Sequence, residues 1–118
     1  MPILTVTIAE GLVDAISRTS EETSEGLLGL IHKYLAPAAG TEQIMFVPSI
    51  GKVVGCGMLA HLVHRASDSR TAEIRKACAD AICAFLAEKY DCSVRVRLIA
   101  TQSSDIAAAD IFKESGDE

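Results

Sequence analysis

The 118-residue sequence contains no tryptophan, and aromatic residues make up only 4% of it, so its core must be aliphatic. No run reaches the ~18 consecutive apolar residues that a membrane-spanning helix needs, so we expect no membrane contact. Intrinsic disorder is excluded, because hydrophobic residues make up 49% of the chain. Length and composition together predict a single domain, residues 1–118, with one aliphatic core.

The sequence also lacks the signals of secretion and of metal binding. It starts without a basic segment or a cleavage pattern, which predicts a cytoplasmic protein with reduced thiols. None of the four cysteines forms a Cys-x-x-Cys pair, and Cys78 and Cys83 lie in a helical stretch that favours buried structural thiols. His61 and His64 are three residues apart in a strand-like run, so they point to opposite faces and predict no metal site.

Positive charge is scarce, and the net charge of −5 argues against a nucleic-acid ligand. Residues 1–57 carry 3 cations and 6 acids, whereas residues 58–118 carry 8 and 10. Arg95 and Arg97 alternate with apolar residues, so both guanidinium groups leave the same face of a predicted strand. Two like charges about 7 Å apart repel each other, which favours a small carboxylate between them. The alternative is an edge strand that faces water.

Hydrophobic periodicity predicts four strands and two helices. The strands are expected at residues 3–8, 44–49, 58–66 and 93–102, and the helices from about residue 20 to residue 36 and over residues 71–90. The alternative for residues 12–16 is an earlier turn or an extension of the first helix. Thr19 and Glu22 fit a capping box at the start of the first helix, and Asp68 or Ser69 is the expected cap of the second. The segment from residue 105 is expected to form a short strand or turn before an acidic end.

The element order predicts two βαβ units, residues 1–57 and 58–118, with parallel strands in each. The fold class is therefore α/β (α+β), with a four-stranded mixed sheet and two helices on one face. Apolar residues on the other face predict a partner copy, hence an oligomer. The same order also fits a ferredoxin-like βαββαβ sheet, typical of regulatory modules, in which a hairpin joins the second and third strands.

Pro2 directly follows the initiator methionine, and small second residues usually permit removal of that methionine. Removal would leave Pro2 as a free secondary amine. Burial in an apolar strand disfavours the charged form of such an amine, and nearby arginines disfavour it further. A neutral amine of this kind is a general base. The alternative is that a proline at this position has no chemical role.

Several short motifs together resemble the tautomerase superfamily. These are the start MPILTVTI, the element order, CAFLAEKY at 83–90 and SVRV at 93–96. In size the chain is similar to the macrophage migration inhibitory factor and 5-carboxymethyl-2-hydroxymuconate isomerase groups. The resemblance implies a homotrimer with a pocket between subunits, and a keto–enol tautomerase or isomerase without a cofactor.

The resemblance also implies roles for individual residues. Pro2 matches the catalytic amino-terminal proline of the family, and Arg95 and Arg97 would bind a substrate carboxylate beside the Pro2 of a neighbouring subunit. Lys33 and Phe112 are similar in position to a lysine and to a carboxy-terminal aromatic residue of the migration inhibitory factor group.

Arg65 ends the third predicted strand, within reach of such a pocket. The main alternative is a non-catalytic trimeric ligand-binding or structural protein with a vestigial Pro2. The expected substrate is a small keto or enol acid.

Overall fold

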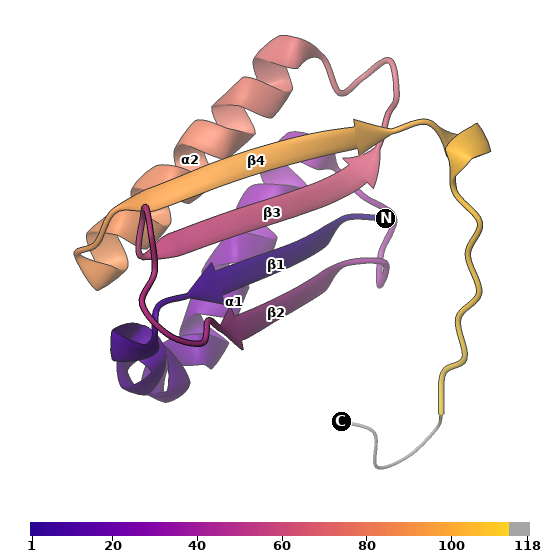
Figure 1. The fold of residues 1–118 in the computed structure, drawn as a ribbon. Coiled ribbons are helices and arrows are strands. Elements are labelled where there is room, and N and C mark those ends of the chain that lie inside the picture. Colours follow the sequence, from indigo (N-terminus) through magenta and orange to yellow (C-terminus); the bar gives the residue numbers. More distant parts are fainter. Residues whose placement is uncertain (114–118) are drawn as a thin grey trace.

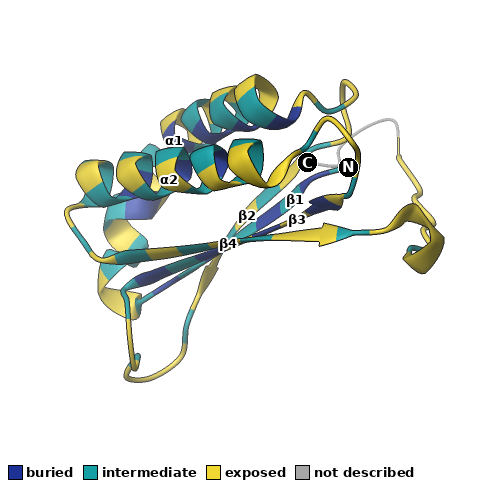
Figure 2. Cartoon of the chain, turned by 90° about the horizontal axis from the view of Figure 1, so that it is seen from above, coloured by how far each residue is buried: buried dark blue, intermediate teal, exposed yellow. Residues whose placement is uncertain are grey.

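A computed structural model describes residues 1–113, which form one sheet and two long helices (Figure 1). The strands are β1 (Ile3–Ile8), β2 (Gln43–Pro48), β3 (Met58–Arg65) and β4 (Val94–Thr101). The helices are α1 (Val13–Leu35) and α2 (Ala72–Tyr90), with 3-10 turns at Glu10–Leu12 and Ser103–Asp105. Both long helices lie on the same side of the sheet (Figure 2), which confirms the predicted α+β class.

The strand order is β2-β1-β3-β4. β1 runs parallel to β2, β3 runs parallel to β4, and the two central strands, β1 and β3, are antiparallel. Each parallel pair is connected through a long helix, as parallel strands require. The ferredoxin-like alternative is wrong, because it needs β2 and β3 as hairpin neighbours, and β1 separates them in the described sheet.

Helix α1 begins at Val13, well before the start expected from the capping box. Inside the helix, the Thr19 hydroxyl donates a 2.8 Å hydrogen bond to a carbonyl of the preceding turn. The helix extends toward its amino-terminal end because Ile16 is buried against the core, and this packing outweighs the local capping signal. It ends at Leu35, where Ala36 adopts the left-handed conformation that commonly terminates helices.

Helix α2 is capped by Thr71, whose hydroxyl accepts a 3.2 Å hydrogen bond from the backbone N–H of Ile74. The expectation of a cap at Asp68 or Ser69 was wrong, because those residues lie in the turn before the helix. Within residues 1–113, neither helix is long and apolar enough to cross a membrane.

The core lies between the helices and the sheet and is aliphatic, as predicted. Its strand members are Leu4, Val6, Ile8, Met58, Ala60 and Leu62, and its helix members are Ile16, Leu27, Ile31, Leu35, Cys78, Ile82 and Leu86. The thiol of Cys78 is buried, and burial raises its pKa to about 11. Cys83 is half-buried, so only one of the two expected structural thiols lies fully inside.

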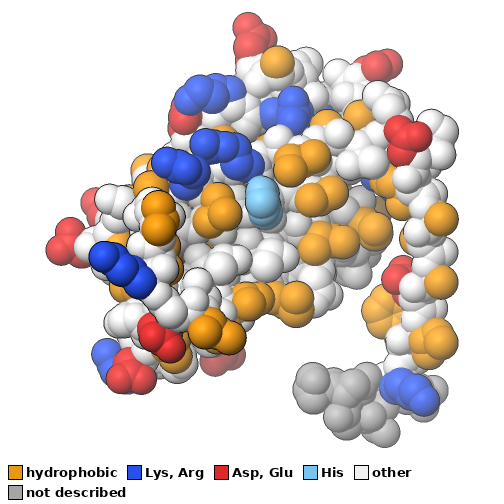
Figure 3. Space-filling model, in the orientation of Figure 1, with side chains coloured by type: hydrophobic (Ala, Val, Ile, Leu, Met, Phe, Trp, Pro, Cys, Tyr) orange, Lys and Arg blue, Asp and Glu red, His pale blue; other side chains and the backbone are white. Residues whose placement is uncertain are grey.

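The opposite side of the sheet, here called the open face, is covered by neither helix (Figure 2). Its exposed apolar residues are Met45, Val47, Val63 and Ile99, each between 38% and 46% exposed. Basic side chains gather over β4 at the upper left of this face in Figure 3. The four described strands contain no acidic residue, so the face combines apolar surface with unbalanced positive charge.

Candidate functional site

Pro2 lies at the start of β1, directly before the first paired residue, Ile3. Its side chain is fully buried, because alternate positions of β1 face the helices. The Pro2 carbonyl accepts a 3.0 Å hydrogen bond from the backbone N–H of Gln43, which ties it to the start of β2. Since Ile3 pairs with Val63 in the antiparallel ladder, Pro2 lies next to His64 in register.

The amino terminus lies beside basic side chains at the carboxyl end of β3. Burial, followed by the charges of Arg70 and Arg65, lowers the pKa of the Met1 amino group. Arg70 is held in place by two backbone carbonyls, with its Nε donating to Leu35 at 3.1 Å and its Nη1 donating to Arg65 at 2.9 Å. The ion pairs found among the described residues include neither arginine, so their positive charge remains available to an anion.

His64 lies beneath this corner and is only 1% exposed. Its Nδ1 is 2.9 Å from the carbonyl of Arg65, and its Nε2 is 3.2 Å from the Nε of Arg75. A carbonyl accepts and a guanidinium donates, so the partners select the neutral tautomer with the proton on Nδ1. Burial first, then Arg70, Arg75 and the amino terminus, lowers the pKa of His64 and favours this neutral form.

Arg75 completes the corner from α2, where its Nη2 donates to the carbonyl of Leu98 at 3.0 Å. Arg65, Arg70 and Arg75 are called the cationic corner below. Arg65 and Arg70 lie beside the start of β1, because the antiparallel pairing of β1 with β3 brings the end of β3 to that point. Arg75 joins them through its hydrogen bond to His64.

Arg95 and Arg97 lie elsewhere, on the open face of β4, in register with Leu59 and His61. Arg97 pairs with His61 of β3, which pairs with Thr5 of β1, three residues after Pro2. Arg97 is therefore displaced from Pro2 by about 10 Å along the strands and by about 10 Å across two strands. Pro2 also faces the helices, whereas these arginines face away from them. One chain therefore does not bring the arginines to Pro2, and their contact with the Pro2 of a neighbouring copy stays a prediction.

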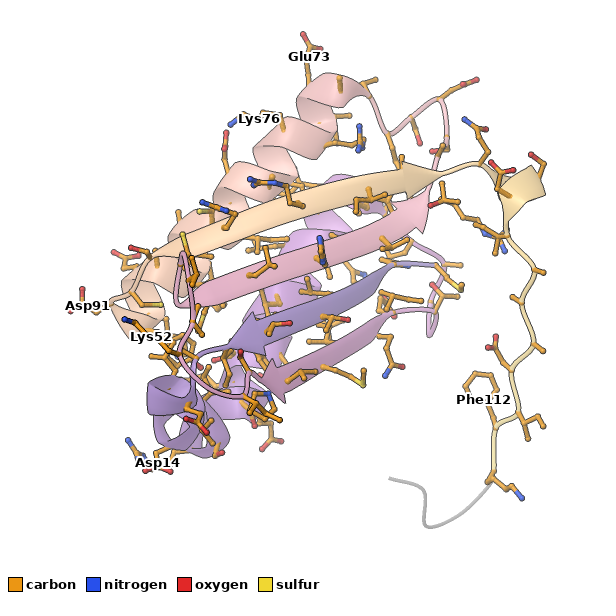
Figure 4. All side chains as sticks on the ribbon, viewed as in Figure 1. Asp14, Lys52, Glu73, Lys76, Asp91 and Phe112 are labelled. Atoms are coloured by element: carbon orange, nitrogen blue, oxygen red, sulfur yellow. The ribbon has the colours of Figure 1, made fainter. Side chains whose placement is uncertain are left out.

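The two remaining candidate site residues, Lys33 and Phe112, also lie on different parts of the fold. Lys33 is exposed on α1, where its ammonium lies 5.2 Å from the ring centre of Tyr34. Phe112 lies on the extended segment after β4 and is 85% exposed (Figure 4). With Met1 and Ile3 it borders a hollow of about 530 Å³. The structure thus places Phe112 across this hollow from the amino terminus and leaves Lys33 on a helix surface.

Sequence reasoning missed Arg70 and Arg75. Arg70 reads as a surface charge at a helix start, but the structure places it half-buried between backbone carbonyls. The sequence does not reveal the pairing of β1 with β3, because this pairing joins segments that are far apart in the chain and produces no local sequence pattern. One signal was available, because the alternation in residues 58–65 puts His64 on the covered face, where a buried ring requires polar partners.

The cationic corner provides a desolvated amino terminus and three basic side chains, which suits anion binding and proton transfer. Within residues 1–113, no group of three or more histidine, cysteine, aspartate or glutamate side chains is arranged to hold a metal.

No family model and no curated protein matches this sequence. Solved structures do resemble it. A macrophage migration inhibitory factor-like protein from Entamoeba histolytica is 10% identical, with a TM-score of 0.68 over 92% of this chain and 95% of that one. N1, a member of the cis-3-chloroacrylic acid dehalogenase family, is 17% identical, with a TM-score of 0.72 over 90% and 79%. A fused 4-OT symmetric trimer is 17% identical, with a TM-score of 0.68 over 92% of each chain.

These proteins are members of the tautomerase superfamily, and the chain described here has the tautomerase fold. The resemblance inferred from its short motifs is thereby confirmed at the level of the fold. Because one fold hosts several reactions, the reaction itself must be argued from the site.

Proposed function

We propose that this chain is a cofactor-independent keto–enol tautomerase or isomerase that acts on a small carboxylate-bearing keto or enol acid. The observation that carries the proposal is the partly buried and electropositive surrounding of the amino terminus. Removal of Met1 would put the secondary amine of Pro2 at this position. Burial and the charges of Arg70 and Arg65 would then favour its neutral form, which is the form that accepts a proton.

In the proposed reaction, the Pro2 nitrogen takes a proton from the carbon beside a carbonyl and returns it to the oxygen, or carries out the reverse transfer. The bonding electrons move into the enolate, so no oxidant or reductant is consumed. Basic side chains stabilise the negative charge that develops on the enolate oxygen. Arg95 and Arg97 of a neighbouring copy hold the substrate carboxylate through paired hydrogen bonds.

The proposal includes self-association through the open face, because Pro2 and the Arg95 row are far apart within one chain. The exposed residues Met45, Val63 and Ile99 supply an apolar surface that a second copy would cover. The structural resemblance to a fused 4-OT trimer supports a trimer as the expected assembly.

Replacement of Pro2 by alanine tests the general base. We expect Pro2→Ala to lower kcat/KM for tautomerisation of phenylpyruvate or 2-hydroxymuconate by about 100-fold or more, the contribution typical of a general base. Pro48→Ala is the matched control, because Pro48 is an exposed proline at the end of β2. Wild-type rates in the Pro2→Ala protein would contradict the mechanism.

The alternative is a non-catalytic ligand-binding or structural protein. It requires that Met1 stays attached to the fully buried Pro2, since an amide nitrogen is not a base. The intact mass of the purified protein separates the two. A mass that includes Met1, together with absent activity, would support the alternative.

Self-association is tested separately by sedimentation velocity. We expect Val63→Glu to dissociate the assembly, because it buries an unpaired carboxylate in the contact. The control is Ala84→Glu, at an exposed position of α2. Equal sedimentation of wild type and Val63→Glu would show that the open face is not the contact.

A further inference from the structure

A second concave site lies at the end of the sheet opposite the cationic corner. It is a cavity of about 300 Å³ between the end of β1, the start of β3 and the loop formed by residues 49–57. This volume is at the lower end of the range typical of small-molecule sites, about 300–1,000 Å³. Its polar lining includes Lys52, Arg95 and Ser49, and its apolar lining includes Val53 and Leu59. It is called the loop cavity below.

The loop that closes this cavity is anchored at both ends to the end of β1. The backbone N–H of Ser49 donates to the carbonyl of Ile8 at 2.7 Å, and the N–H of Ala9 donates to the carbonyl of Gly57 at 2.9 Å. Gly51, with a φ of 81°, supplies the left-handed turn next to Lys52. The anchored loop therefore holds Lys52 beside the sheet, at the edge where β1 ends (Figure 4).

Arg95 and Arg97 do not share this cavity. Arg95 contributes to its lining and also borders, together with Arg97, a different hollow beside Lys76 of α2. Arg97 borders only that second hollow. The Nη1 of Arg97 also donates a 2.9 Å hydrogen bond to the carbonyl of Val96 in its own strand. Within the loop cavity, the cation that accompanies Arg95 is therefore Lys52.

The charge of the loop cavity is not neutralised by the protein. The ion pairs found in the described part of the chain are His32 with Glu42, Lys76 with Asp80, and Lys89 with Glu22. None of them involves Lys52 or Arg95, and the cavity lining contains no acidic residue. Two basic side chains over an apolar wall match a small molecule that has a carboxylate and a short hydrocarbon part.

We propose that Lys52 is a specificity-determining residue that binds the substrate carboxylate together with Arg95. This inference rests on the proposed function, in which Arg95 of one copy serves the Pro2 of another. Lys52 then selects carboxylates over neutral analogues, while the apolar lining contacts the rest of the molecule. Lysine acts as a mobile point charge beside the fixed fork of arginine, so Lys52 adapts to acids of different length.

Steady-state kinetics with Lys52→Gln tests this role, because glutamine keeps much of the side chain's length and removes its charge. We expect KM for phenylpyruvate to rise about tenfold with kcat within about twofold of wild type, since a charge-assisted hydrogen bond to the bound ground state is lost. Lys76→Gln is the control, because this exposed lysine of α2 (Figure 4) already pairs with Asp80. It keeps the wild-type KM.

A binding experiment separates this proposal from the proposed function. Phenylacetate and its neutral analogue phenylacetamide are titrated into full-length wild-type and Lys52→Gln protein, with backbone amide chemical shifts as the readout. Lys52-dependent binding of phenylacetate to residues 49–57, without catalytic activity in the wild type, would support the cavity assignment and refute the tautomerase. Activity in the wild type with unchanged KM and unchanged phenylacetate binding in Lys52→Gln would overturn the role of Lys52 alone.

Discussion

The two faces of the sheet are built from the same strands and differ in almost every physical property. On the covered face, Leu4, Val6 and Leu62 are fully buried beneath the helices. Thr5 and Val63 are the sequence neighbours of these residues and lie on the open face, which no helix covers. His61, on the same face, is exposed. Alternation along a strand thus assigns one set of residues to the core and leaves the other accessible. Substitutions at adjacent positions test this division directly.

The largest expected difference is between Leu62 and Val63 of β3. Leu62→Ala removes buried methyl groups and leaves a cavity, so we expect it to lower the free energy of unfolding by about 3 kcal/mol. Val63→Ala removes partly exposed methyl groups and is expected to cost about 1 kcal/mol or less. Urea unfolding followed by circular dichroism, at one fixed protein concentration, measures both values. Similar costs for the two variants would mean that the open face is as tightly packed as the core.

Helix α1 also has a packed side and an open side, and two of its glycines, Gly26 and Gly29, lie on these different sides. A Cβ added at Gly26 would overlap the ring of Phe85, whereas a Cβ added at Gly29 meets no atom within 4 Å. Gly29→Ala should therefore stabilise the protein by about 0.5–1 kcal/mol, through its higher helix propensity. Gly26→Ala should destabilise it by about 1 kcal/mol, because the half-buried ring of Phe85 must shift from its packed position. Thermal unfolding of both variants checks this pair, and stabilisation by Gly26→Ala would contradict the tight contact between α1 and α2.

The smallest expected effect is a pH dependence due to the buried His64. Burial and the nearby positive charges lower its pKa in the folded state, so on acidification the unfolded chain binds a proton before the folded one does. The contribution of His64 is complete above the ordinary histidine pKa of about 6.5 and is lost as pH falls toward the folded-state value. We expect His64→Gln to flatten the decline of unfolding free energy below neutral pH, while His61→Gln, on the open face, keeps the wild-type slope. Equal slopes in all three proteins would exclude this linkage.

The sheet and its faces could be predicted from sequence because alternation is a local pattern. Residues 3–8 form β1 with the predicted bounds, and the other strands differ from prediction by about one residue at their ends. The start of α1 stayed open between residue 20 and an extension through Ile16, because the capping residues Thr19 and Glu22 provide a weak local signal. The burial of Ile16 is a tertiary effect that such a signal does not contain.

Only part of the candidate site could be predicted from the sequence, because its other residues come together through tertiary contacts. Pro2 and Arg95 belong to recognisable motifs, so the sequence was enough to make them candidates. Arg70 became a candidate only after the pairing of β1 with β3 placed it beside the amino terminus, and Arg75 only through its hydrogen bond to His64. Lys52 lies in a loop with no motif, and its relation to Arg95 depends on how the ends of that loop are anchored.

The strand order has a further consequence for how the chain reaches its native state. Ile3 pairs with Gln43 and Val63, and Met58 pairs with Val94, so every ladder of the described sheet spans at least one complete helical crossover. Without a hairpin to start from, the chain must close long loops before strand pairing offsets the lost entropy. We expect the helices to form early and the sheet late, which exposes the aliphatic strands of a newly made chain to aggregation until β1 meets β3.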